Sequence, residues 1–159
     1  MTERRADVVV TVLDAAAAVA LERREPPGRR YARWAAAAQD RGELTVLVAW
    51  AGTEPVGSGE VTAGDEPELR NLRVDLDHRG RGVGSALIAA AERLAAACGV
   101  LRIGVALDNP DARRLYERAG YVATGEVQEY DYTYVDDDGR QVTAQEASAY
   151  LAKNLRGGA

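Results

Sequence analysis

The stretch from residue 69 to residue 107 reads as a strand, a glycine-rich loop, a helix and a second strand, and this order constrains the fold of the chain. Residues 69–76 and 100–107 are apolar and extended in pattern, whereas apolar residues from Leu87 to Cys98 recur at helical spacing. A strand, a helix and a strand in succession form a βαβ crossover, which joins parallel strands of a sheet. The chain therefore needs a parallel or mixed sheet with helices packed on it.

The loop in this unit, residues 79–84 with the sequence RGRGVG, has the composition of an anion-binding turn. Glycines let the backbone approach a ligand closely, and the start of the following helix presents free N–H groups and the positive end of its dipole. Arg79 and Arg81 can add full positive charges. A phosphate or pyrophosphate suits such a loop, and the alternative is a structural turn whose arginines lie in solvent.

The strand before the loop has an irregular spacing. Leu72 and Val74 are two residues apart, as residues on one face of a strand should be, but Leu69 precedes Leu72 by three. A β-bulge between Leu69 and Leu72 would place all three side chains on the same face, and it would free backbone groups for a ligand. The alternative is a strand that is buried on both faces.

The rest of the chain alternates between strand and helix patterns. Asp14 and the sequence Asn109-Pro110-Asp111 have the chemistry of helix starts. The expected strands are residues 8–13, 44–51, 56–62 and 129–135, with a further one beginning at Tyr121, and the expected helices outside the crossover are residues 14–24, 30–41 and 110–120.

Charge and cysteine content argue against several classes of protein. The net charge of −5 gives no general attraction to nucleic acid or to an anionic membrane surface. Cys98 is the only cysteine and His78 the only histidine, so we expect neither an intrachain disulfide nor a metal site. No segment approaches transmembrane length, and we expect residues 1–159 to form a single cytoplasmic domain.

Two common phosphate-binding motifs do not match the loop. A Walker A motif needs lysine followed by serine or threonine after its last glycine, which argues against a nucleotide kinase. The dinucleotide motif needs the spacing G-x-G-x-x-G and an acidic ribose ligand downstream, which argues against a Rossmann dehydrogenase.

Two segments together resemble the GNAT superfamily of N-acetyltransferases. Arg79, Gly82 and Gly84 fit the family's pyrophosphate-loop pattern Q/R-x-x-G-x-G/A, and residues 109–121, NPDARRLYERAGY, resemble its signature of asparagine, helix, tyrosine and closing glycine-aromatic pair. The resemblance implies an α/β fold with a mixed, mostly antiparallel central sheet, one parallel pair around the βαβ crossover, and helices on both faces. It also places a final strand near residues 148–155, while helix propensity leaves Ala144 to Ser148 undecided between helix and strand.

The resemblance implies acetyl-coenzyme A as a co-substrate and no metal. The loop would bind the pyrophosphate, and the bulged strand would pair its backbone with the pantetheine arm. Asn109 would cap its helix and hydrogen-bond the cofactor. The residues expected at the cofactor are Leu72, Arg73, Val74, Arg79, Gly80, Arg81, Gly82, Val83, Gly84, Ser85 and Asn109.

The implied reaction is direct attack of a primary amine, from a small molecule or a peptide N-terminus, on the acetyl group. Tyr116 corresponds to the family's general acid, and the alternative is an ordinary tyrosine packed on the sheet. Glu68 is the first choice for the general base, directly or through a water, and the alternative is a solvated edge carboxylate. A main-chain N–H near Leu72 or Val74 could stabilise the developing negative charge.

The acceptor pocket is the part that the sequence describes least. The resemblance implies that the first two helices, the hairpin and the C-terminal strands build it, and a final edge strand could support a homodimer. A noncatalytic coenzyme A-binding module and an acyltransferase with a larger donor are the alternative functions. The aromatic and acidic residues that could hold an ammonium group, or else be ordinary core and surface positions, are Tyr31, Trp34, Trp50, Glu126, Glu129, Tyr130 and Tyr132.

Overall fold

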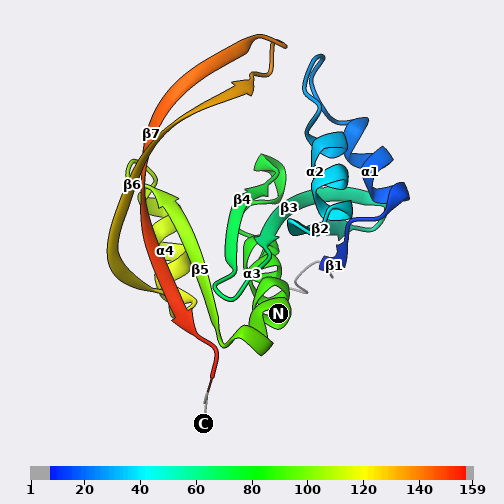
Figure 1. Ribbon diagram of the computed structural model, residues 1–159. Helices are drawn as coiled ribbons and strands as arrows, with labels where there is room; N and C mark the ends of the chain where they lie inside the picture. The colour runs from blue at the N-terminus through cyan, green and yellow to red at the C-terminus, as the bar shows by residue number, and fades with distance from the viewer. Residues whose placement is uncertain (1–7, 157–159) are drawn as a thin grey trace.

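Seven strands form one sheet, in the order β1-β2-β3-β4-β5-β7-β6, in the computed structural model, which describes residues 8–156 (Figure 1). Strands β4 and β5 run parallel, and the other neighbouring pairs are antiparallel. This confirms the predicted mixed, mostly antiparallel sheet with one parallel pair. The strands are β1 (Val8–Val12), β2 (Leu44–Ala51), β3 (Glu54–Thr62), β4 (Glu68–Val74), β5 (Val100–Ala106), β6 (Val122–Val135) and β7 (Gln141–Asn154).

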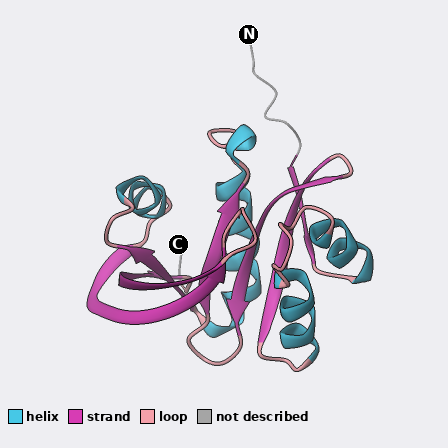
Figure 2. Cartoon of the chain, turned by 90° about the horizontal axis from the view of Figure 1, so that it is seen from above, coloured by secondary structure: helices cyan, strands magenta, loops and turns pink. Residues whose placement is uncertain are grey.

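Helices cover both faces of the sheet, as predicted (Figure 2). Alternate residues of β2 show how the two layers form, since Val46 and Val48 pack in a cluster with residues of α1 and α2, whereas Leu47 and Ala49 pack in the main core with α3. Both faces of β2 are therefore mainly apolar. The helices are α1 (Ala15–Glu22), α2 (Tyr31–Asp40), α3 (Val83–Ala95) and α4 (Pro110–Arg118).

Strand β4 contains the predicted β-bulge. Arg70 of β4 pairs with Glu60 of β3. Three residues further on, Arg73 pairs with Ser58, which is only two residues from Glu60, so β4 carries one extra residue. The backbone accommodates this residue at Asn71, whose φ of 52° lies in the left-handed region.

The bulge places Leu69 and Leu72 on the same face of β4. A β-carbon at Gly59 of the neighbouring strand would lie 3.1 Å from Leu69 Cδ1 and 3.5 Å from Leu72 Cδ1. Leu69 is fully buried, and Leu72 packs against the same core. The strand ends at Val74 rather than at Leu76, because Leu76 begins a short 3₁₀ turn, Leu76–His78, that leads into the loop.

Strands β4 and β5 stay paired for only two residue pairs, Glu68 with Arg102 and Leu69 with Ile103. Beyond these pairs β4 is paired with β3 alone and β5 with β7 alone, and the two ribbons diverge (Figure 1). The bulge lies on the first diverging residues of β4. The edges of β4 and β5 that face each other therefore carry backbone groups outside the sheet ladder.

Strands β6 and β7 form a long hairpin that arches toward the loop between α1 and α2 (Figure 1). Residues 144–148 belong to β7, so the helical alternative for this segment is wrong. Cross-strand pairing with β6 outweighs the helix propensity of the segment. At the hairpin tip, Arg29 Nε and Nη2 donate to the carbonyl oxygen of Val135 at 3.2 and 2.8 Å, which ties the tip to the loop between α1 and α2.

Gly57 of β3 lies where β4 and α3 come closest to the strand. A β-carbon at Gly57 would lie 2.8 Å from the carbonyl oxygen of Arg73 and 3.0 Å from Val83 Cγ1. We expect Gly57→Ala to lower the free energy of unfolding by about 1–3 kcal/mol, because neighbouring backbone would have to move. Chemical denaturation measures this change.

Gly84→Ala is the matched control for Gly57→Ala. A β-carbon at Gly84 would lie 3.2 Å from Leu115 Cδ2, which is the flexible end of a side chain. The helix preference of alanine over glycine, about 1 kcal/mol, would offset this crowding, so we expect a change near zero. Equal losses of stability in the two variants would contradict the packing explanation.

Candidate active site

The glycine loop ends at the N-terminus of α3 with unsatisfied donors. Gly82 is the N-cap residue with φ of 84°, and no side chain caps the helix. The first N–H groups of α3 therefore have no intrahelical partner, and no acidic residue occupies the first turn. A negatively charged group suits these donors and the helix dipole.

The arginines and glycines of this loop have different surroundings. Arg79 and Arg81 are exposed, and Arg79 Nε donates to the carbonyl oxygen of Val74 at 3.2 Å. Gly80 and Gly82 have open space where a β-carbon would lie, whereas Gly84 is close to Leu115 of α4. Gly84 therefore serves the contact between α3 and α4 as well as the loop pattern.

Asn109 starts α4 and thereby sets the position of Tyr116. The Asn109 Oδ1 atom accepts a hydrogen bond from the N–H of Ala112 at 3.1 Å, and Pro110 occupies the first turn. Two turns later, Tyr116 is 6% exposed and belongs to the main core. Burial raises the pKa of the Tyr116 hydroxyl, so the group keeps its proton at neutral pH.

Glu68 belongs to the first of the two residue pairs that join β4 to β5, one residue before the strands separate. It is half-buried, and a β-carbon at Gly104 of β5 would lie 3.5 Å from its Oε1 atom. Burial raises the pKa of the Glu68 carboxyl, while the positive charges of Arg70 and Arg102 partly oppose the shift. A carboxylate with a raised pKa is a stronger base than an exposed one.

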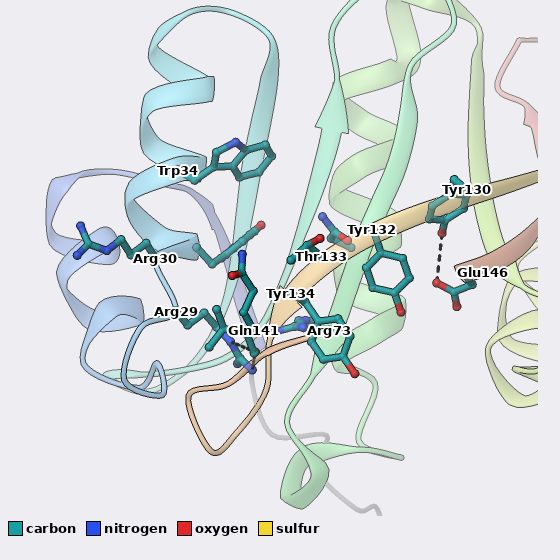
Figure 3. A pocket seen from close by; sticks show the side chains of 13 residues that line it. Arg29, Arg30, Trp34, Arg73, Tyr130, Tyr132, Thr133, Tyr134, Gln141 and Glu146 are labelled. Atoms are coloured by element: carbon teal, nitrogen blue, oxygen red, sulfur yellow. Dashed lines mark hydrogen bonds between the residues drawn. The ribbon is translucent and has the colours of Figure 1, made fainter. Parts of the chain in front are cut away.

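A groove with a volume of about 670 Å³ separates α2 from the β6–β7 hairpin, beside the bulge of β4 (Figure 3). Tyr130, Tyr132 and Tyr134 follow one another at two-residue spacing along β6, with ring centroids 5.9 and 5.6 Å apart. They form a row of aromatic rings along one wall. The residues that line the groove are Arg29, Arg30, Tyr31, Trp34, Asn71, Arg73, Tyr130, Tyr132, Thr133, Tyr134, Val135, Gln141 and Glu146.

The structure separates the expected acceptor residues into two groups. Four of the seven residues line the groove: Tyr31, Trp34, Tyr130 and Tyr132. The other three residues lie elsewhere, since Trp50 Nε1 donates to Thr11 Oγ1 at 2.8 Å on the β1–β2 side of the sheet and Glu126 pairs with Arg102 at 2.5 Å. Glu129 is exposed on β6 and is not among the residues that line the groove.

A fully buried carboxylate that the sequence analysis missed, Glu60 of β3, lies behind the groove wall. Glu60 Oε2 accepts hydrogen bonds from the Tyr31 hydroxyl at 2.6 Å and from Asn71 Nδ2 at 2.9 Å, and Oε1 accepts one from Arg70 Nε at 3.1 Å. Glu60 thus connects α2 with the bulge residue of β4. Burial and the neighbouring Glu60 raise the pKa of Tyr31, so Tyr31 remains a donor. The sequence signal for this site is Glu60 itself, an acidic residue between small and apolar residues in the strand expected at residues 56–62.

Other reactive side chains lie away from the groove and the loop. Cys98 closes the turn Ala96–Cys98 after α3, at the end opposite the loop, and its Sγ donates to the carbonyl oxygen of Gly64 at 3.5 Å. Within residues 8–156, no group of three or more His, Cys, Asp or Glu side chains is arranged to hold a metal ion. No helix in this part of the chain combines the length and the apolar character that crossing a membrane requires.

The chain matches the family model for the acetyltransferase (GNAT) family over residues 12–121. Among solved structures, it is similar to the ribosomal-protein-S18-alanine N-acetyltransferase from Escherichia coli, with a TM-score of 0.68, 21% identity and 96% coverage of each chain. A putative acetyltransferase from Salmonella typhimurium, solved with its cofactor acetyl-CoA, gives a TM-score of 0.63 at 20% identity, again with 96% coverage of each chain. No curated protein matches the sequence. At these identities the structural matches show a shared fold.

Proposed function

Since the chain belongs to the acetyltransferase (GNAT) family, we propose that it transfers an acetyl group from acetyl-coenzyme A to a primary amine by direct attack. The observation that carries this proposal is the separation of β4 and β5 after two residue pairs, next to an uncapped helix N-terminus. Unpaired backbone edges suit an amide-containing arm, and the free N–H groups of α3 suit a pyrophosphate. These features fit one ligand that has both groups.

The residues that would hold acetyl-coenzyme A fall into two sets. The backbone of Leu72, Arg73 and Val74 would pair with the pantetheine arm, and residues 79–85, with the charges of Arg79 and Arg81, would bind the phosphates. Asn109, exposed at the start of α4, would add a polar contact. When bound, the thioester supplies the activated acetyl group.

Two side chains have the properties that the reaction requires. Glu68 would accept a proton from the acceptor nitrogen as the new N–C bond forms and the C–S bond breaks, and its raised pKa favours this role. Tyr116 would donate the proton of its hydroxyl to the departing sulfur, because burial keeps that hydroxyl protonated. Because the amine attacks the acetyl group directly, no covalent enzyme intermediate forms. Glu68 and Tyr116 would return to their starting protonation states by proton exchange with solvent.

The test is a measurement of free thiol during incubation with acetyl-coenzyme A and a panel of primary amines. We expect thiol release that depends on the amine and equals the amount of acetylated amine found by mass spectrometry. Tight cofactor binding without thiol release from any amine would contradict the proposal and would favour a noncatalytic binding module. Release with propionyl-coenzyme A, and none with acetyl-coenzyme A, would identify a larger donor.

The proposed role of Glu68 predicts a specific pH dependence. A base is active when deprotonated, so log(kcat/KM) should rise with slope near two below the pKa of Glu68, which burial raises above its ordinary value of 4.5. Ionisation of the base and ionisation of the amine each contribute about one unit of slope. Above that pKa only the amine still titrates, and the slope should fall to about one.

Glu68→Gln should abolish the steeper part of this pH profile and leave a slope near one throughout. Glu126→Gln is the matched control, because Glu126 pairs with Arg102 in the same region but is exposed. An unchanged profile in Glu68→Gln would remove Glu68 from the mechanism.

A further inference from the structure

The side chains that line the groove carry an excess of positive charge, since they include three arginines and one glutamate. Arg29 is already engaged, because it donates to the Val135 carbonyl and lies 3.4 Å from Asp137 Oδ1. Arg30 and Arg73 are exposed, and neither belongs to the ion pairs found among residues 8–156. Figure 3 shows Arg30 extending from the start of α2 away from the groove, so of these two arginines it is Arg73 whose guanidinium is available to a ligand there.

The negative charge and the positive charge of Arg73 lie at different places along the groove. Figure 3 shows Glu146 beside Tyr130 at one end and Arg73 next to Tyr134, further along the row of tyrosines. The Tyr130 hydroxyl lies 3.3 Å from Glu146 Oε2, to which it donates, and 3.2 Å from Ser148 Oγ. The groove therefore has a polarity along its length.

Aromatic rings fill the distance between the charged ends. Trp34 is 47% exposed and its ring lies 6.0 Å from that of Tyr31, while Tyr132 and Tyr134 stack on the opposite wall. Such rings bind an apolar body, and their faces attract an ammonium group. A ligand that complements the groove has a cationic group at one end and an anionic group at the other, joined by an apolar segment or by a short linker.

We propose that the acceptor is a small zwitterionic amine: a primary amine that also carries a carboxylate or a phosphate. Arg73 binds the anionic group, since a guanidinium group matches both anions in geometry and charge. Glu146 and the tyrosine row attract the ammonium end. Polyamines are poor acceptors, because the excess of arginine repels a second positive charge. This assignment rests on the proposed acetyl transfer and names the acceptor class for that same site.

Matched pairs of acceptors test the class and separate the two anions. 4-(Aminomethyl)benzoate is compared with benzylamine, and O-phosphoethanolamine with ethanolamine, with spermidine as the polycation. We expect kcat/KM to be about 10- to 100-fold higher for the anionic member of at least one pair, which is the effect of one well-formed charged hydrogen bond. A larger ratio in the first pair identifies a carboxylate as the anionic group of the acceptor, and a larger ratio in the second pair identifies a phosphate. Ratios near one in both pairs, or a preference for spermidine, would overturn the proposal.

Substitutions assign the preference to Arg73. Arg73→Gln should reduce the ratio between the anionic and neutral acceptors about tenfold, mainly through KM of the anionic acceptor, and Arg73→Lys should restore part of it. Arg93→Gln is the matched control, because Arg93 is exposed in the last turn of α3. A ratio that stays at the unsubstituted value in Arg73→Gln would contradict the assignment.

A binding measurement separates failure of this assignment from failure of the proposed chemistry. The chain has two tryptophans, so in a Trp50→Phe background Trp34 is the only one and its fluorescence reports on the groove. 4-(Aminomethyl)benzoate or O-phosphoethanolamine should change this signal at concentrations where benzylamine and ethanolamine do not, and Arg73→Gln should weaken the effect about tenfold. Selective binding without thiol release supports the acceptor class and contradicts acetyl transfer. Thiol release without anion-selective binding supports acetyl transfer and contradicts the acceptor class.

Discussion

Tyr116→Phe should lower kcat for acetyl transfer at least about 100-fold, because general acid catalysis contributes roughly 10²- to 10⁴-fold to a reaction rate. The dissociation constant of acetyl-coenzyme A should stay within about threefold of its original value, since the hydroxyl acts on the departing sulfur rather than in binding. Phenylalanine keeps the aromatic ring, and with it the packing of a side chain that is 6% exposed. Steady-state kinetics and calorimetric titration with acetyl-coenzyme A measure the two quantities.

Tyr121→Phe is the control for this substitution. Tyr121 is also buried in the main core, at 2% exposed, and its hydroxyl is buried without a hydrogen-bond partner among the described residues. We expect kcat to change less than about twofold in this variant, since Tyr121 has no proposed role in proton transfer. A Tyr116→Phe enzyme with an unchanged kcat would mean that Tyr116 only packs against the sheet.

Gly82→Val should weaken acetyl-coenzyme A binding about 10- to 100-fold. Gly82 has φ of 84°, and a residue with a β-carbon pays roughly 1–2 kcal/mol or more to hold a left-handed conformation. The free loop would relax away from this conformation, and binding would have to restore it before the N–H groups of α3 could meet the pyrophosphate. Each 1.4 kcal/mol of that cost lowers the affinity about tenfold.

Gly52→Val is the control, because it also places a β-branched residue at a position with positive φ, but outside the loop. Gly52 lies in the turn between β2 and β3 with φ of 62°, and open space surrounds the position of its β-carbon. The free energy of unfolding should fall in both variants, while the affinity for acetyl-coenzyme A should fall only in Gly82→Val. Retained affinity in Gly82→Val would contradict the assignment of the loop as the phosphate site.

Local signals in the sequence were sufficient to predict the secondary-structure elements that form the proposed acetyl-coenzyme A site. The βαβ crossover, the glycine-rich loop before α3 and the cap at Asn109 each depend on local patterns in the chain, so the sequence predicts them. The bulge of β4 was detectable because one irregular spacing, from Leu69 to Leu72, disturbs a period of two. The family resemblance then connected these parts to one ligand.

The acceptor groove could be predicted only in fragments, because its walls come from distant parts of the chain. Tyr31 and Tyr132 are about a hundred residues apart in sequence, and they line the same groove because the β6–β7 hairpin arches toward the loop between α1 and α2. Glu146 was missed because its segment had the propensity of a helix, and the strand forms through pairing with β6. Glu60 was missed because nothing local shows that Tyr31, Arg70 and Asn71 surround it.

The short junction between β4 and β5 has a mechanical consequence. Only two residue pairs join the half of the sheet that contains β1–β4 to the half that contains β5–β7, so the two halves form leaves that meet at a narrow hinge, with α3 packed across it. A ligand bound between the two halves would hydrogen-bond to the strand edges as an added strand does, and it would restrict the motion of one half relative to the other. We therefore expect slower amide hydrogen exchange on both sides of the hinge when acetyl-coenzyme A is present, including residues of β5 that the ligand does not touch.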